Sequence, residues 1–344
     1  MEEKETPSAR ENVVPTGEGR LGLDVGTSKI LAMRKSGNEV LAATEVNAFI
    51  PLPFSRFTQN ILLQNKVRYY TDNGHFYVYG NSAEKFASLW NAETRRPMSR
   101  GLINPNEPSA LTLIKVIIEG LVKKPRGKDE VVYFSVPGAP VEAPSDLIYH
   151  EALLKEFLEG LGYRAKSINE GLAVVFSELE KESFTGIGIS AGGGMCNVCL
   201  AYLSVPVISF SVSKAGDYID RSVGSVTGES ATRVKVIKEQ SLDLTRSARD
   251  KVEEALHIYY NDVVETLVGS LKEALGRASN MPRLDRPIPV VLAGGTSRPK
   301  GFRERFDKAF RQSGFPLEIS EVRLSPHPME ATARGSLLAA IYEG

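Results

Sequence analysis

The chain has 344 residues, enough for about two domains, and it balances 42 basic against 42 acidic side chains. Such a balance gives no electrostatic footprint for nucleic acid or for an anionic membrane surface. Its two cysteines exclude a disulfide framework and indicate a reducing compartment. No signal peptide opens the sequence and no apolar run approaches the ~18 residues of a membrane span, so we expect a cytoplasmic protein.

The N-terminal stretch, Met1 to Glu18, is polar, contains two prolines and shows no apolar periodicity, so we expect a disordered tail. The segment Leu21–Ile30 then reads as an apolar strand, a glycine turn and a second apolar strand. Such a pattern predicts a β-hairpin. By itself the stretch is also consistent with an ordinary hairpin that has a polar tip.

The tip of this hairpin carries groups suited to a phosphate tail. Gly26 lets the backbone approach an oxyanion closely, and successive turn amides can form an anion-binding concavity. Thr27 and Ser28 add hydroxyl donors, and Lys29 adds a positive charge. Asp24 would repel phosphate directly, so its position makes sense if a cation lies between them; Mg²⁺ is often held in this way by one or two carboxylates.

The next part of the chain alternates predicted strands and helices. Strand-like composition covers Val40–Val46, Lys66–Tyr70, Phe76–Tyr79 and Val131–Val136. Helical spacing of apolar residues covers Ser109–Val122 and His150–Leu161. The apolar patch Phe49–Phe54 could contact a membrane or partner, but its prolines limit sheet pairing, so we expect a packed loop. The order of elements predicts an α/β fold with helices covering a sheet.

A second glycine hairpin follows at Gly186–Tyr202. Its turn holds Gly192, Gly193 and Gly194, which is costly in folding entropy unless some backbone must come close. Asp24 and Ser190 precede the two turns and are 166 positions apart, which suggests a duplicated domain with a cleft between the halves. Cys196 and Cys199 form a C-x-x-C pattern here, but on a strand they face opposite sides, so we expect structural thiols.

A third glycine loop occurs at Val290–Arg298, where an apolar strand runs into Gly294 and Gly295 before a predicted helix start near Arg298–Arg305. This arrangement suits a flat base, or a phosphate at a helix N-terminus. A long helical stretch, Ser247–Ala278, precedes it.

With these three loops in this order, the sequence resembles the actin superfamily, most closely the MreB-type bacterial actins and the magnetosome filament actin. The resemblance extends from Arg20 to Ala340. The segments that carry it are Asp24–Lys29, Arg96-Pro97-Met98, Gly101-Leu102-Ile103, Val136-Pro137, Asn169-Glu170, Gly192–Gly194, Ala215–Asp220, Ile237–Gln240, Gly294–Ser297 and Ala331–Gly335. It implies a two-domain fold, a duplicated mixed sheet flanked by helices, which clamps ATP and Mg²⁺ in its cleft and polymerises head to tail.

The resemblance also implies roles for individual residues. Asp24 would hold hydrated Mg²⁺, the turns Gly26–Ser28 and Gly192–Gly194 would hold the phosphates, and Glu170 would orient the attacking water. Lys29 falls at a variable position and is equally consistent with a solvent-facing lysine. The remaining nucleotide contacts would be Gly216, Asp217, Lys238, Glu239, Gly294, Gly295 and Thr296.

Some of these residues have a simpler reading. Without the resemblance, Glu170 is a charge favoured by a helix dipole, and Lys238 and Glu239 form a solvated helix face. Asp217 and Asp220 are better explained as capping or bracing the helix that follows them.

Two features depart from the family pattern. The second phosphate loop usually begins with aspartate and contains a threonine, but this chain has Ser190 and Met195. Losing one charge-assisted contact is worth about 1.5–3 kcal/mol, so we expect hydrolysis to be slow or absent. The small strand-rich subdomain that the family places after Gln240 is also reduced or replaced by helix.

The expected protein is therefore an actin-like ATP-binding filament former with a cell-organising or scaffolding role. Its first domain would comprise residues 19–167 and 325–344 and its second residues 168–324. The alternatives are a non-polymerising ATP-binding regulator, a reactivation factor or a small-molecule kinase of the same superfamily. No extra catalytic base stands out for a kinase, and no peptide-binding domain follows the cleft for a chaperone.

Overall fold

The computed structural model describes residues 19–37, 39–90, 93–125, 127, 129–142, 146–278 and 281–342. The predicted disordered tail, residues 1–18, lies outside the described residues. Within the described part, no helix is both long enough and apolar enough to cross a membrane.

The first large sheet contains five strands in the order β10-β9-β1-β2-β3. The strands are β1 (Leu21–Val25), β2 (Lys29–Ser36), β3 (Glu39–Val46), β9 (Val131–Val136) and β10 (Arg164–Asn169). The first three form an antiparallel meander, whereas β9 runs parallel to β1 and β10 runs parallel to β9. We call this sheet, with the helices packed on it, the first lobe.

The second large sheet repeats this topology in the order β13-β12-β11-β14-β15. The strands are β11 (Gly186–Ala191), β12 (Cys196–Tyr202), β13 (Val205–Val212), β14 (Ile288–Ala293) and β15 (Ile319–Leu324). Again three antiparallel strands are followed by two parallel ones. The duplication expected from the two glycine hairpins is therefore confirmed, and this sheet with its helices is the second lobe.

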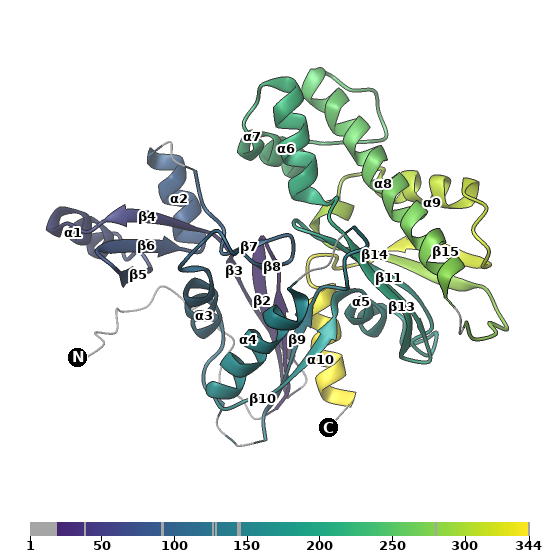
Figure 1. Cartoon of the computed structure of the whole chain (residues 1–344), viewed down its shortest axis with the longest axis horizontal. Helices are drawn as coiled ribbons and strands as arrows, with labels where there is room; N and C mark the ends of the chain where they lie inside the picture. The colour runs from purple at the N-terminus through teal and green to yellow at the C-terminus, as the bar shows by residue number, and fades with distance from the viewer. Residues whose placement is uncertain are drawn as a thin grey trace.

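Two helices lie between the sheets and join the lobes (Figure 1). Helix α5 (Glu170–Glu178) packs on β11 and β12, α10 (Ala331–Tyr342) packs on β1 and β9, and the two helices pack on each other. Their crossing is close: a Cβ atom on Gly335 would lie 1.7 Å from the carbonyl oxygen of Ala173. Only glycine fits at that point.

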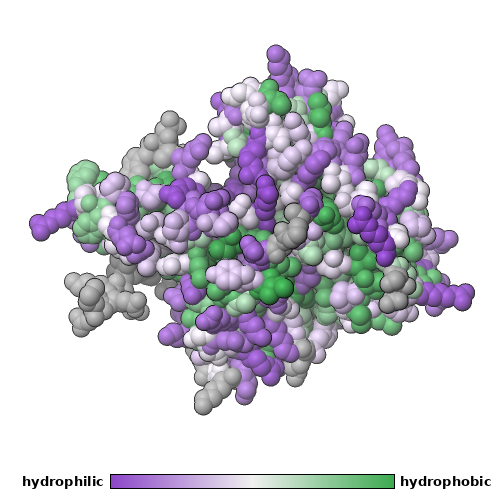
Figure 2. Space-filling model, viewed as in Figure 1, coloured by the Kyte–Doolittle hydropathy of each residue, from purple (hydrophilic) through white to green (hydrophobic). Residues whose placement is uncertain are grey.

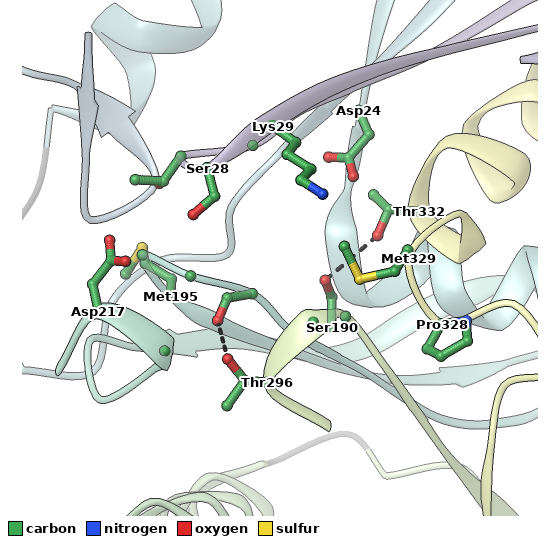
Figure 3. A pocket seen from close by; sticks show the side chains of 18 of the residues that line it. Asp24, Ser28, Lys29, Ser190, Met195, Asp217, Thr296, Pro328, Met329 and Thr332 are labelled. Atoms are coloured by element: carbon green, nitrogen blue, oxygen red, sulfur yellow. Dashed lines mark hydrogen bonds between the residues drawn. The ribbon is translucent and has the colours of Figure 1, made fainter. Parts of the chain in front are cut away.

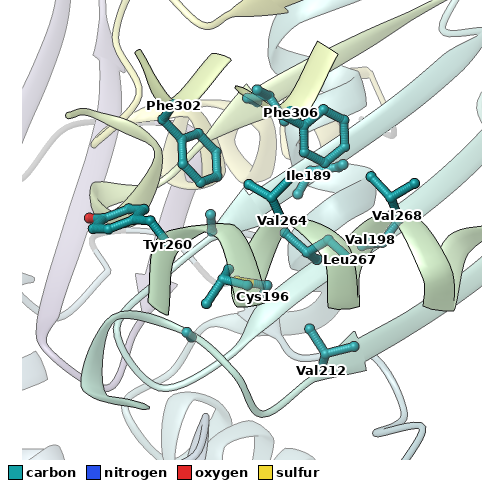
Figure 4. Close-up of a cluster of buried hydrophobic side chains, with 14 of the residues drawn as sticks. Ile189, Cys196, Val198, Val212, Tyr260, Val264, Leu267, Val268, Phe302 and Phe306 are labelled. Carbon is teal, nitrogen blue, oxygen red and sulfur yellow. The ribbon is translucent and has the colours of Figure 1, made fainter. Parts of the chain in front are cut away.

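The outer helices cover the far faces of the sheets. In the first lobe these are α3 (Ala110–Leu121) and α4 (Leu147–Gly160), and in the second α6 (Gly216–Thr227), α8 (Lys251–Arg277) and α9 (Phe302–Gln312). The apolar residues at helical spacing on α3 are all buried: Leu113, Ile114, Ile117, Ile118 and Leu121. Figure 4 shows how α8 and α9 fill the second core, with side chains that include Val264, Leu267, Val268, Phe302 and Phe306.

A small sheet in the first lobe corrects one expectation. Its order is β4-β6-β5, with β4 (Phe49–Pro53), β5 (Tyr69–Asp72) and β6 (His75–Tyr79), and it is accompanied by α1 (Arg56–Gln64) and α2 (Asn81–Trp90). The packed loop predicted at Phe49–Phe54 is wrong, because these residues form strand β4. Pro51 and Pro53 are tolerated because β4 is an edge strand.

The corresponding place in the second lobe is simpler. Residues 228–250, all of which the structure describes, contain helix α7 (Ala231–Gln240) and no strand. The predicted reduction of this subdomain is confirmed. The space-filling view shows the molecule hollowed between the α2 side and the α6–α7 side (Figure 2).

Several predicted boundaries shift by a few residues. The strand expected from Lys66 begins at Tyr69, and the helix expected near Arg298–Arg305 begins at Phe302, after the 3₁₀ turn η1 (Gly295–Ser297). The short strands β7 (Met98–Ser99) and β8 (Leu102–Ile103) were not predicted. Cys196 and Cys199 are buried free thiols in two different apolar clusters, as their opposite directions on β12 require.

Candidate functional site

The two glycine hairpins have the same local geometry. In the β1–β2 turn the Gly26 amide donates to the Lys29 carbonyl at 3.0 Å, and in the β11–β12 turn the Gly192 amide donates to the Met195 carbonyl at 3.0 Å. In each hairpin the donor is the first residue after the incoming strand, and its hydrogen bond closes the turn. The lobes therefore present two equivalent backbone tips.

These tips touch each other. A Cβ atom on Gly193 would lie 2.3 Å from Ser28 Oγ, and one on Gly194 would lie 2.3 Å from Thr27 Oγ1. The hydroxyls of the first tip thus occupy the space that side chains would take on the second. The close approach inferred from three successive glycines is an approach of the opposite lobe. Thr27 Oγ1 is fixed in addition by the Gly101 amide, which donates to it at 3.0 Å.

Every nucleotide-site residue proposed from the sequence lines one cavity of ≈ 280 Å³ between the lobes. These residues are Asp24, Gly26, Thr27, Ser28, Lys29, Glu170, Ser190, Gly192, Gly193, Gly194, Gly216, Asp217, Lys238, Glu239, Gly294, Gly295 and Thr296. Figure 3 shows Asp24, Ser190 and Thr332 toward one side of the pocket and Ser28, Met195 and Asp217 toward the other. The cavity is close to the lower end of the size range of small-molecule sites.

Two carboxylates lie at the floor of this cleft. Asp24 accepts a hydrogen bond from Ser135 Oγ at 2.9 Å, and Glu170 accepts one from Ser190 Oγ at 3.1 Å. Glu170 is held there because Asn169 caps α5, its side chain accepting from the Gly171 and Leu172 amides.

The floor strongly disfavours two negative charges. Burial raises the pKa of Asp24 to about 6, against the lowering effect of the Ser135 hydroxyl. Burial and the nearby charge of Asp24 raise the pKa of Glu170 to about 8. Near neutral pH this pair therefore retains a proton unless a cation neutralises it.

The donor set around the pair fits a cation that keeps most of its waters. No group of three or more His, Cys, Asp or Glu side chains that could hold a metal occurs in the described part of the chain. Ser190 contributes a hydroxyl, 3.4 Å from Thr332 Oγ1, in place of a third carboxylate. One or two carboxylates with water and phosphate oxygens is the usual environment of Mg²⁺, so the residues present fit that ion.

Asn197 is a cleft residue that the sequence analysis missed. It lies directly opposite Ser190 in the β11–β12 pairing and is buried. Its Oδ1 accepts from the Gly138 amide at 2.8 Å, while its Nδ2 has no hydrogen-bond partner of good geometry among the described residues. The available signal was an amide side chain in an otherwise apolar strand that follows a glycine turn.

The far wall of the cleft corrects two further expectations. Lys238 is not part of a solvated helix face: it is 7% exposed, its Nζ lies 2.7 Å from Asp220 Oδ1, and it donates to the Gly216 carbonyl at 3.0 Å. Asp220 therefore braces α6 against α7, as expected. Glu239, by contrast, is exposed on the same helix.

Asp217 is not the cap of α6, because Ala215 occupies the N-cap position and Asp217 lies within the first turn of the helix. Its carboxylate instead accepts from Arg96 of the first lobe at 2.7 Å. Thr296 closes the wall, donating from Oγ1 to the Gly192 carbonyl at 2.7 Å. Lys29 is exposed at the cleft, which is consistent both with a phosphate ligand and with a solvent-facing lysine.

Comparison with solved structures identifies the fold. MamK in a double helical filament matches with a TM-score of 0.67 at 18% identity, over 94% of this chain and 98% of that one. MreB 5 of Spiroplasma citri, bound to AMPPNP, matches with a TM-score of 0.65 at 16% identity, over 94% and 96%. The ethanolamine utilization protein EutJ of Carboxydothermus hydrogenoformans matches with a TM-score of 0.56 at 15% identity, over 96% and 93%.

These likenesses show the fold alone: a two-domain actin-like α/β fold. No curated protein matches the sequence. The family described as Volactin matches residues 20–340, nearly the whole chain. The protein is therefore a member of the Volactin family and carries the actin-like fold that its glycine hairpins predict.

Proposed function

We propose that this protein binds ATP with Mg²⁺ between its lobes and assembles into filaments with a cell-organising or scaffolding role. The observation that carries the nucleotide part is that two glycine tips, one from each lobe, meet at a cavity that is also lined by the carboxylates of Asp24 and Glu170. Structural neighbours support it, since MreB 5 was solved with AMPPNP and with ADP, and a MamK mutant with AMPPNP.

In this proposal the two tips hold the phosphates. The Gly26 and Gly192 amides are used within their turns, so the amides of Thr27, Ser28, Gly193 and Gly194 would donate to phosphate oxygens. The exposed Lys29 adds positive charge. The wall formed by Gly216, Lys238, Glu239 and Gly294 to Thr296 would hold the nucleoside. Asp24 would hold the hydrated Mg²⁺, which neutralises phosphate charge when it is bound.

Glu170 is the candidate for orienting water toward the terminal phosphate. It must be ionised to accept a proton from water, and a cation beside Asp24 would lower its raised pKa. Ser190 supplies a hydroxyl and no negative charge. We therefore expect the protein to bind ATP but to hydrolyse it slowly.

We further propose that the lobes correspond to folding domains. The first would comprise residues 19–167 together with 325–344, and the second residues 168–324. Support comes from the sheets: the second stretch contains the whole of its five-stranded sheet, and the first contains the other sheet except for Ile168 and Asn169 at the end of β10. Helix α10 then returns the chain to the first lobe, against β1 and β9.

The filament part of the proposal draws on MamK, whose solved structure is a double helical filament. An asymmetric contact between two different faces of a subunit generates an open filament when its rotation does not close. Self-association of this kind needs no other partner.

Two measurements test the proposal. Titration calorimetry with Mg²⁺·AMPPNP and Mg²⁺·ADP should show saturable heat, and the absence of heat with both would refute nucleotide binding. Sedimentation with Mg²⁺·ATP, with Glu170→Gln as the slow-turnover control, should move protein into the pellet. A wild-type protein that binds nucleotide but stays in the supernatant at high concentration would instead be a non-polymerising regulator.

A further inference from the structure

One arginine connects the two lobes directly at the glycine tips. Arg96, which precedes β7 in the first lobe, donates from Nη1 to both carboxylate oxygens of Asp217, at 2.7 and 2.8 Å. The same nitrogen lies 3.3 Å from Ser28 Oγ. Arg96 therefore contacts the first tip and holds a carboxylate that belongs to the second lobe.

Asp217 is itself attached to the second tip. Its backbone amide donates to the Gly193 carbonyl at 2.8 Å, at the start of α6. A Cβ atom on Gly193 would also lie 3.5 Å from Asp217 Oδ1. A continuous series of polar contacts thus runs from Ser28 through Arg96 and Asp217 to Gly193, and we call these four residues the clasp.

The carboxylate of Asp217 is not suited to binding a phosphate tail. Asp217 lines the cleft, yet its negative charge would repel a phosphate tail. A carboxylate at this position is useful if it is neutralised by Arg96. The pair is only about a quarter exposed, with 26% of the Arg96 side chain and 21% of the Asp217 side chain accessible, so water and salt screen it less than a surface pair.

A second ion pair across the cleft provides a contrast. Lys235 of α7 lies 3.5 Å from Glu84 of α2, with the Glu84 side chain 46% exposed. This pair is longer and more solvated, and it contacts neither tip. It joins the lobes without fixing the two turns against each other.

We propose that Arg96 and Asp217 are positioning residues that hold the two tips in register, and that the clasp sets how long a nucleotide stays in the cleft. The inference rests on the proposed nucleotide binding. A bound nucleotide leaves by separation of the tips, and separation breaks the Arg96–Asp217 pair. The clasp acts on the lobes and not on the terminal phosphate, so it retains diphosphate and triphosphate alike.

The test compares Arg96→Gln, Asp217→Asn and the double variant with wild type. Release of fluorescently labelled ADP and AMPPNP is followed by stopped flow. Each single variant should release both nucleotides about ten-fold faster, as the loss of a charge-assisted hydrogen bond implies. The double variant should be no faster than either single one, because both remove the same interaction.

Arg95→Gln is the matched control. Arg95 neighbours Arg96 in the sequence but pairs with Glu107 of its own lobe, its Nε donating to Oε1 at 2.8 Å. Its release rates should equal those of wild type. Additive effects of the two substitutions in the double variant would contradict the clasp. Faster release of AMPPNP alone would also contradict it, because that result would place Arg96 on the terminal phosphate.

Small-angle scattering without nucleotide separates this inference from the proposed function. The radius of gyration should rise in Arg96→Gln and Asp217→Asn and stay at the wild-type value in Arg95→Gln. If wild type binds neither nucleotide but this pattern holds, nucleotide binding fails and the lobe contact stands. If nucleotide binds and no variant changes either the release rate or the radius of gyration, the clasp alone fails.

Discussion

The two hairpin tips share one backbone geometry and differ in nearly every side chain. The first presents hydroxyls and a lysine behind Asp24, whereas the second presents three glycines behind Ser190. The hydroxyls of Ser28 and Thr27 pack against Gly193 and Gly194. The second tip therefore has no room for side chains at the two positions where the first tip has them. The duplicated element has thus become a matched pair, and its asymmetry follows from packing.

The most severe way to break this match is to add a methyl group to the second tip. In Gly194→Ala the new Cβ atom would lie 2.3 Å from Thr27 Oγ1 and 2.9 Å from the Gly101 amide nitrogen. Overpacking of this kind costs about 1–3 kcal/mol, so nucleotide affinity should fall about 10- to 100-fold. Calorimetry with Mg²⁺·AMPPNP measures the change.

Gly269→Ala is the control for that substitution. Gly269 lies exposed within α8, and nothing lies within 4 Å of the position its Cβ would take. Alanine there should raise stability by about 0.5–1 kcal/mol and leave binding unchanged. Equal affinities of Gly194→Ala and wild type would show that the tips are not in contact in solution.

A second substitution would make the tips more alike at their strand ends. Ser190→Asp gives the second hairpin the carboxylate that Asp24 gives the first, which should raise any hydrolysis rate about ten-fold with Mg²⁺ present. Phosphate release measures the rate, and Ser190→Asn is the uncharged control. A rate no higher than that of Ser190→Asn would contradict a catalytic role for charge at this position.

The smallest expected effect concerns the carboxylate pair below the tips. The folded-state pKa of Glu170, about 8, lies above its ordinary value of 4.5, so the folded protein binds more protons than the unfolded chain between these values. Stability without Mg²⁺ should therefore fall as pH rises, by about 1 kcal/mol between pH 7 and 8.5. Urea unfolding measures this difference.

Glu170→Gln should remove most of that pH dependence, since glutamine does not titrate. Asp24, with a pKa of about 6, is already largely ionised in this range. Stability that rises from pH 7 to 8.5 in wild type, or an identical slope in Glu170→Gln, would contradict a shared proton at the floor of the cleft.

The sequence was informative where local patterns determine structure. Glycine turns between apolar strands identified both hairpins, and helical spacing identified α3 with its buried face. It was less informative where a residue's surroundings come from distant segments. The sequence of α7 alone predicts that Lys238 is exposed. Its burial depends on α6, which places Asp220 beside it.

The same limit applies to Asp217, whose partner Arg96 is 121 residues away. Pro51 and Pro53 misled the strand assignment because prolines are excluded from central strands, while the position of β4 at a sheet edge depends on tertiary pairing. Local sequence therefore located the cleft, but not the contacts that distant segments make across it.

The close crossing of α5 and α10 has a mechanical consequence. With Gly335 against the Ala173 backbone, the helices can neither approach further nor slide past each other easily, and the simplest remaining motion is a swivel about this point. Such a pivot, low in the molecule, would leave the carboxylate floor almost still and move the distal ends of α1 and α7 the most. Small rotations at this point would then become large displacements at the periphery of the two lobes.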